Sequence, residues 1–178
     1  KSGNKETMPH FLSMTATPIP RSFALTLYGD LDLSVIKQMP PGRKPTQTRL
    51  VEEKNRPKVY EFLADKIEQG EQAFVVCPLI EPSENMADKK SVRQEYQRLN
   101  EEIFPQLQVE QMHGNIDEQK KSKIMQDFAA GEIDILVSTT VIEVGVDVPR
   151  ATIMVIENAE RFGLAQLHQL RGRIGRGG

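Results

Sequence analysis

The sequence has no tryptophan, a single cysteine and only 6% aromatic residues among its 178 positions. With Cys77 alone, no disulfide can form within the chain, which agrees with a reducing compartment. No apolar run approaches the ~18 residues that a membrane-spanning helix needs. Residues 1–10 are polar and lack the apolar centre of a signal peptide. These absences predict a cytoplasmic protein.

An excess of charge of one sign is also missing, since the formal net charge is −2. Global basicity therefore gives no indication of a nucleic-acid partner. Arginine is concentrated locally, and from Arg150 to the end there are five arginines against two glutamates. A basic face on a near-neutral protein is compatible with phosphate contacts, although charge clustering alone is more typical of a solvated face.

The sequence contains no Gly-x-x-x-x-Gly-Lys-Ser/Thr, the loop that cradles nucleotide phosphates. His10, His113 and His168 lack Cys or His neighbours at zinc spacing, so no metal site is indicated. The acids of Asp117-Glu-Gln-Lys120 lie at a predicted helix start, where they complement the helix dipole. We therefore expect the chain on its own to bind ATP weakly and to hydrolyse none.

What is present is an alternation of apolar strands and amphipathic helices from Gln47 onward, which predicts an α/β fold with a parallel sheet covered on both faces. Predicted strands span residues 46–52, 72–79, 109–112, 133–137 and 152–156. Predicted helices span residues 56–69, 91–104, 117–130 and 163–171. Their periodicity predicts buried positions at Val59, Phe62, Leu63 and Ile67, and at Ile124, Phe128 and Ala129.

Hydroxyl groups follow the predicted strand 133–137, in Ser138-Thr-Thr-Val-Ile-Glu-Val-Gly-Val-Asp-Val-Pro149. Ligands of parallel sheets lie beyond the carboxyl ends of the strands. Thr139 and Thr140 can donate to phosphate oxygens there, Gly145 allows a tight backbone, and Asp147 can accept from a ribose or hold an arginine. The alternative is an ordinary Ser/Thr-capped turn.

Two other segments leave predicted strands in the same way. In Gln111-Met-His-Gly-Asn-Ile116, His113 and Asn115 could touch a sugar-phosphate backbone, although a lone histidine is more often structural. In Met14-Thr-Ala-Thr-Pro18, Thr15 and Thr17 offer hydroxyls, although the segment by itself is more typical of a plain exit from a strand into a turn.

The last residues place three arginines among glycines in Gln166-Leu-His-Gln-Leu-Arg-Gly-Arg-Ile-Gly-Arg-Gly177. Arginine presents a rigid fork of donors that matches phosphate oxygens, and neighbouring glycines let the backbone approach a ligand closely. The alternative is a basic tail that binds any polyanion.

The Gln-x-x-Gly-Arg-x-x-Arg spacing from Gln169 to Arg176 resembles the closing motif of superfamily-two helicases. The segments 14–18, 111–116 and 140–147 resemble other motifs of that family. The resemblance implies a truncated RecA-like second helicase lobe, with a parallel sheet and helices on both faces. It also implies ATP and Mg²⁺ as cofactors, bound mainly by a first lobe that the chain lacks.

The resemblance implies roles for particular residues. Arg173 and Arg176 would contact the γ-phosphate, with support from Gln169. Gly145 and Asp147 would face the nucleotide. Contact with DNA falls to Thr139, Thr140, His113 and Asn115. Thr15 and Thr17 couple the hydrolysis site to the interlobe contacts.

Three further segments, Tyr28-Gly-Asp-Leu-Asp32, Pro40-Pro-Gly-Arg-Lys-Pro-Thr46 and Val76-Cys-Pro-Leu-Ile-Glu81, are similar to the bacterial ATP-dependent helicases of branched DNA. This narrower resemblance implies a bacterial cytoplasmic motor that acts on stalled forks and Holliday junctions in recombination and repair. Its partners would be branched duplex DNA and the first helicase lobe of the same chain. The alternatives are the second lobe of a transcription-repair coupling translocase and a non-enzymatic polyanion-binding domain.

The same resemblance implies a domain organisation. Residues 1–20 would be the tail of the first motor lobe, 21–46 an interlobe linker and helix, and 47–178 the second RecA-like lobe, incomplete at its C-terminus. Since the sequence begins Lys-Ser-Gly-Asn and stops at Gly177-Gly178, we expect a piece of a larger protein.

Overall fold

Four parallel strands form the sheet of the computed structural model, in the order β2-β3-β1-β4. They are β1 (Gln72–Val76), β2 (Val109–Met112), β3 (Ile135–Ser138) and β4 (Ala151–Ile156). All three neighbouring pairs are parallel. The structure describes residues 45–78, 92–139 and 148–175, together with Leu12, Met14, Ser34, Ile36 and Gln38. The predicted parallel α/β sheet is therefore confirmed.

The central strands β1 and β3 are buried along their whole length. A strand that is covered on both faces needs a nearly continuous apolar sequence, and Ala73-Phe-Val-Val76 and Ile135-Leu-Val137 supply it. Successive side chains of β1 point to opposite faces. Phe74 and Val76 thus join one core cluster, and Ala73 and Val75 join the other.

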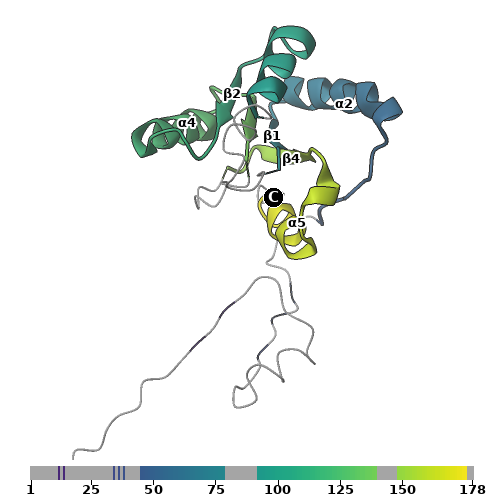
Figure 1. Cartoon of the computed structure of the whole chain (residues 1–178), viewed down its shortest axis with the longest axis vertical. Coiled ribbons are helices and arrows are strands. Elements are labelled where there is room, and N and C mark those ends of the chain that lie inside the picture. The colour runs from purple at the N-terminus through teal and green to yellow at the C-terminus, as the bar shows by residue number, and fades with distance from the viewer. Residues whose placement is uncertain are drawn as a thin grey trace, which may run out of the picture. The chain divides into compact units, whose positions relative to one another are not determined.

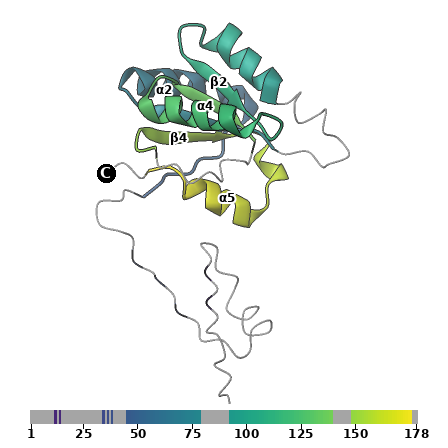
Figure 2. The ribbon, with the colours of Figure 1, turned by 90° about the vertical axis from the view of Figure 1, so that its left-hand side faces the viewer.

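Helices cover both faces of this sheet (Figures 1 and 2). One core cluster combines α2 (Arg56–Glu68) with the helical residues 92–97 and the π-helix η3 (Arg98–Ile103) that continues them. The other cluster combines α4 (Glu118–Ala130) and α5 (Leu164–Arg171). Short 3-10 turns, η1 (Glu53–Asn55) and η4 (Ala159–Arg161), precede α2 and α5.

Local signals account for the helix boundaries. The Asp117 side chain accepts a hydrogen bond of 2.8 Å from the backbone N–H of Lys120 and so caps α4. The same helix ends at Gly131, whose φ of 86° lies in the left-handed region that glycine adopts without strain. A proline in the first turn opens α2.

Three sequence predictions are wrong. No strand forms at 46–52, where Leu50 is 94% exposed, because no described strand lies beside this segment to pair with it. Phe62 is 49% exposed and Ala129 is exposed, although Leu63, Ile67, Ile124 and Phe128 are buried as predicted. The errors at Phe62 and Ala129 lie at the margin of a helix's apolar face, where burial depends on what packs against it.

The chain divides into two units, Lys1–Ile36 and Lys37–Gly178, and the sheet and its helices belong to the second. The division falls inside the range 21–46 that the sequence assigns to an interlobe segment. None of the described helices is both long and apolar enough to span a membrane.

Candidate nucleic-acid and nucleotide interface

Candidate residues meet at the carboxyl edge of the sheet. Met112 and Ser138, the last residues of β2 and β3, are partners in the parallel register. The residues that follow, His113 and Thr139, therefore leave the sheet side by side. The backbone N–H of Thr139 donates to the carbonyl oxygen of Met112 at 3.4 Å. Local sequence places each residue after its strand, and only the strand pairing brings the two together.

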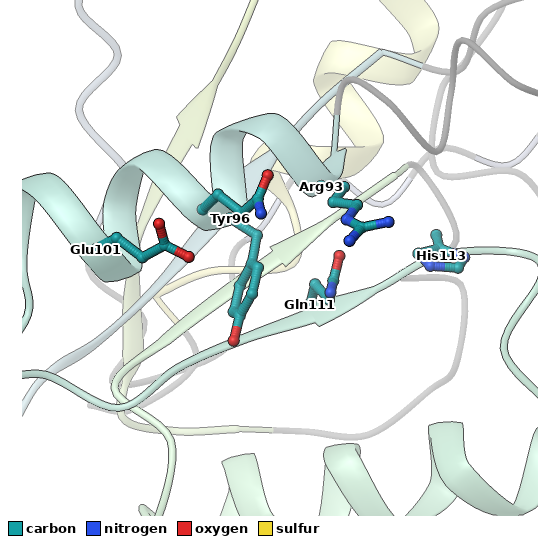
Figure 3. Close-up of a pocket in the computed structure, with 6 residues that line it drawn as sticks. Arg93, Tyr96, Glu101, Gln111 and His113 are labelled. Carbon is teal, nitrogen blue, oxygen red and sulfur yellow. The ribbon is translucent and has the colours of Figure 1, made fainter.

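A pocket of about 390 Å³ opens between β2 and the helix 92–103. Figure 3 shows Arg93 and Tyr96 reaching from this helix toward Gln111 and His113 on the strand side. Gln97 and Glu101 complete the lining. Burial raises the pKa of the Tyr96 phenol, with a further rise from Glu110 and Glu101, so this group is a neutral hydrogen-bond donor at physiological pH.

The donors in this pocket suit a sugar-phosphate backbone. Arg93 is exposed and carries a permanent charge. The Oε1 atom of Gln111 is buried and has no hydrogen-bond partner among the described residues. Glu101, at the far end, carries the opposite charge and would keep a phosphate near Arg93.

The three predicted DNA contacts among the described residues differ in access. Asn115 is exposed, His113 is half-buried and Thr139 is 1% exposed. The space beside Gly114 is open, because an added Cβ there would meet no atom within 4 Å. A nucleic-acid strand at this edge would therefore meet Asn115 and His113 before Thr139.

The arginine segment is anchored by its neighbours. Leu170 and Ile174 are buried in the core cluster of α4 and α5, whereas Arg173 between them is half-buried. No ion pair involves Arg173 within the described part of the chain. Arg171, by contrast, lies 3.2 Å from the Nδ1 atom of His168. The backbone thus holds Arg173 firmly and leaves its charge for an anion.

Gln169 is exposed on the last turn of α5, and its carbonyl oxygen accepts from Gly172 at 3.0 Å. Gln169 and Arg173 therefore sit on either side of the end of one helix, as the sequence motif predicts. The remaining candidate residues lie outside the described residues: Thr15, Thr17, Thr140, Gly145, Asp147 and Arg176.

A charged network occupies the same edge at the end of β4. Both oxygens of Glu157 accept from the Arg56 guanidinium, at 2.9 and 2.6 Å. This hydrogen bonding raises the pKa of Arg56 further above its usual range. Glu95 lies nearby, and burial raises the pKa of its carboxyl group despite the hydrogen bond from Arg98.

ATP and Mg²⁺ differ in how well the described residues fit them. Arg173 is half-buried and has no ion-pair partner among the described residues, so a donor for an anionic phosphate exists. Glu157, the carboxylate that follows β4, is already bonded to Arg56. The described residues bring together no group of three or more metal-ligating side chains. These residues therefore fit a phosphate and do not fit the cation.

Sequence reasoning missed the residues that depend on tertiary contacts. Arg93, Tyr96 and Gln97 lie on a helix whose sequence carries no motif, and only packing against β2 turns them toward His113. Arg56 and Glu157 are 101 residues apart, so no local spacing could indicate their pairing. Gln111 belonged to the predicted segment 111–116, but the burial of its Oε1 atom could be recognised only in the structure.

A parallel sheet with helices on both faces, followed by α5 and the arginine segment after it, is typical of a helicase-type C-terminal lobe. Residues 54–178 match the family described as "Helicase conserved C-terminal domain". The chain belongs to this family. The predicted RecA-like second helicase lobe is confirmed at the level of family and fold.

Two relatives and one solved structure indicate which helicases of this family the chain is similar to. The chain is 57% identical over 175 residues to the ATP-dependent DNA helicase RecG of Thermotoga maritima. The matched region covers 98% of this chain and 22% of that protein. It is 53% identical over 173 residues to the RecG of Synechocystis, covering 97% and 21%. A solved structure of RecG bound to a three-way DNA junction has a TM-score of 0.71 and 56% identity, covering 91% of this chain and 21% of that one. The chain thus spans about a fifth of the length of these relatives.

Proposed function

We propose that the chain is the second motor lobe of a RecG-type, ATP-dependent DNA helicase that acts on branched DNA in recombination and repair. The chain matches relatives named ATP-dependent DNA helicase RecG over nearly its whole length. A similar RecG chain has been solved on a three-way DNA junction. The observation that carries the proposal is the arginine segment, in which Arg173 is held between the buried residues Leu170 and Ile174 without an acidic partner among the described residues.

The chain's part in ATP turnover is to neutralise charge. Hydrolysis of bound ATP would supply the free energy, Mg²⁺ would neutralise part of the charge on the phosphate oxygens, and the first lobe would hold most of the nucleotide and the metal. Arg173 and Arg176 donate to the γ-phosphate oxygens and stabilise the negative charge that builds up as the bond breaks. Gln169 supports this contact from the end of α5, and Gly145 and Asp147 line the nucleotide side. Closure of the two lobes brings the arginines into reach.

The DNA interface in this proposal is the carboxyl edge of β2 and β3 together with the pocket beside it. Asn115 and His113 meet the backbone first, Arg93 binds a phosphate, and the buried Thr139 is reached after them. Thr140, the next residue in the chain, is proposed as a further DNA contact. Contacts of this kind position the strand without reading its sequence, which suits a motor that acts on DNA shape. Thr15 and Thr17 then couple hydrolysis to the interlobe contacts.

The domain organisation and location are part of the same proposal. Residues 1–20 complete the first motor lobe, 21–46 link the lobes, and 47–178 form the second lobe. The bacterial sources of the relatives support a bacterial origin, and the cytoplasmic location is part of the proposal.

The test is the DNA-stimulated ATPase activity of the full-length protein that contains this chain, compared on a model fork and on linear duplex of equal length. Higher activity on the fork is the expected result. Equal activity on the two DNAs would favour a coupling translocase, and DNA binding without any ATPase would favour a polyanion-binding domain.

A further inference from the structure

Arg56 and Glu157 form a two-point contact across the fold. Nη1 and Nη2 of Arg56 donate to Oε1 and Oε2 of Glu157 at 2.9 and 2.6 Å. Arg56 is the first residue of α2, and Glu157 follows the last residue of β4. Parallel fork-to-fork hydrogen bonds of this kind fix both distance and orientation. The pair therefore joins the start of α2 to the end of β4.

Neighbouring side chains restrain this pair. Arg56 also donates to the hydroxyl of Tyr60 at 3.1 Å, and Glu95 lies 3.9 Å away. Arg98 donates to Glu95 at 2.7 Å and also to the hydroxyl of Tyr60. The side chains of Arg56 and Glu157 are only 24% and 14% exposed. Burial weakens screening by salt, so this pair is a stronger restraint than an ion pair on the surface.

The chain between Glu157 and the arginine segment is short and conformationally fixed. The backbone N–H of Glu157 donates to the carbonyl oxygen of Val76 at 2.9 Å. Asn158 follows in the left-handed region, with φ of 49°, and Phe162 is 8% exposed in the core. Gly163 then starts α5 as its N-cap. A displacement of Glu157 would therefore also displace α5 and Arg173.

On the other side of the pair, the chain that leads into α2 has few contacts of its own. Residues 45–54 are exposed except for the half-buried Thr46, and Leu50 is 94% exposed. Arg56 is thus the first residue of this approach with several side-chain contacts to the sheet and helices. The path of the incoming segment depends on where Arg56 is held.

We propose that Arg56 and Glu157 are positioning residues of the motor. Their contact holds segment 45–54, which leads into α2, in a fixed position relative to turn 157–163, which precedes α5 and the arginine segment. The proposal rests on the proposed function of the chain as a motor lobe. Movement of the incoming segment would be transmitted through the pair to Arg173. Neither residue touches substrate, and both act through the placement of Arg173 on the γ-phosphate.

A purely stabilising ion pair is the ordinary alternative, and the same helix offers a matched control. Lys66 and Glu71 form an ion pair of 2.9 Å at the opposite end of α2, with side chains 32% and 28% exposed. This second pair is comparable in length and burial, but it does not involve the turn 157–163. A structural role alone predicts similar consequences for the loss of either pair.

The test uses four variants of the full-length enzyme: Arg56→Gln, Arg56→Lys, Glu157→Gln and the double variant Arg56→Gln/Glu157→Gln. The control is Lys66→Gln, also in the full-length enzyme. Measurements are kcat and KM for ATP on a model fork, the Kd for that fork, and the midpoint of thermal unfolding. We expect each Gln single variant to lower kcat by ~10- to ~100-fold, the range that small misplacements of catalytic groups produce. The Kd for DNA should stay unchanged. Arg56→Lys keeps the charge but loses the two-point guanidinium contact, so its kcat should lie between those of wild type and Arg56→Gln.

The double variant should lower kcat no further than the worse single variant, because both residues act through one contact. A kcat for Arg56→Gln and Glu157→Gln as high as that of Lys66→Gln would overturn the proposal, as would full additivity in the double variant. If Arg56→Gln unfolds below the assay temperature, the nearly isosteric Glu157→Gln decides by the same criteria. A wild-type enzyme without DNA-stimulated ATPase would instead overturn the proposed function, before any variant is compared.

Discussion

Thr139 donates its backbone N–H to the carbonyl oxygen of Met112 at 3.4 Å, so the loops that follow β2 and β3 start side by side. One loop begins with His113, and the other begins with Thr139, just before the segment 140–147 that resembles a helicase motif in sequence. Neighbouring parallel strands place their carboxyl ends at one edge. A contact between two strand ends thus assembles a candidate DNA interface from segments 26 residues apart in the sequence.

Replacement of Arg93 by alanine should weaken DNA binding by the full-length enzyme through the loss of one phosphate contact. Affinity measured at several salt concentrations should show the slope of log K against log salt shrinking by about 1. Lys123→Ala is the control, because Lys123 is exposed on α4 and already pairs with Asp127 at 2.7 Å. An equal loss of affinity in both variants would indicate a general charge effect and remove Arg93 from the interface.

Gln72→Leu should destabilise the fold without touching the candidate site. Gln72 is 2% exposed, and its Nε2 atom donates to the carbonyl oxygens of Phe128 and Ile133, both at 2.6 Å. Leucine would leave the carbonyl oxygen of Ile133 buried without a partner, at a cost of about 1–3 kcal/mol. The carbonyl oxygen of Phe128 would keep its hydrogen bond of 3.1 Å from the backbone N–H of Gly131. Urea unfolding of the 178-residue chain measures the change. Gln106→Leu at an exposed position should stay within about 0.5 kcal/mol of wild type.

Glu95 should make the free energy of unfolding depend on pH. Burial raises the pKa of its carboxyl group above the ordinary 4.5, against the opposing effect of Arg98. The folded chain thus binds this proton more tightly than the unfolded chain does. Stability from this residue is greatest below pH 4.5 and decreases as the pH rises through the folded-state pKa.

Glu95→Gln removes this titration. The stability of the variant relative to wild type should therefore increase as the pH is raised from below 4.5 toward neutrality, as measured by urea unfolding at each pH. A difference between the two proteins that does not vary with pH would show that Glu95 titrates normally.

The isolated 178-residue chain should bind ATP weakly and hydrolyse none, with or without DNA. Its sequence lacks the phosphate-cradling loop, and the described residues do not fit Mg²⁺. Phosphate release from the pure chain over hours is the measurement. Steady release that scales with the concentration of the chain would contradict the assignment of the nucleotide pocket to another lobe.

The sequence was sufficient for features that depend on neighbours in the chain. The cap at Asp117, the stop at Gly131 and strand β2 follow from residues within one turn or one strand, and all three lie where they were predicted. The alternation of strands and helices allows few topologies, so the parallel sheet was also predictable from the sequence.

Features that depend on partners far along the chain were not predictable. Residues 46–52 have a sequence suited to a strand, but strand formation requires a neighbouring strand with free hydrogen-bonding groups. Phe62 fits the helical period, and its 49% exposure is set by what α2 packs against. The pairing of Arg56 with Glu157 and the place of Arg93 beside His113 exist only once the sheet has formed.

The most direct test of the proposed motor role is the ATPase activity of Arg173→Ala and Arg176→Ala in the full-length enzyme on a model fork. Each change should lower kcat by ~10³-fold or more, as loss of such an arginine does in related phosphoryl-transfer sites, while DNA binding is largely kept. Arg171→Ala is the control, since Arg171 is exposed and lies against His168. Loss confined to Arg173 and Arg176 is the predicted result, and near-normal kcat in both variants would contradict it.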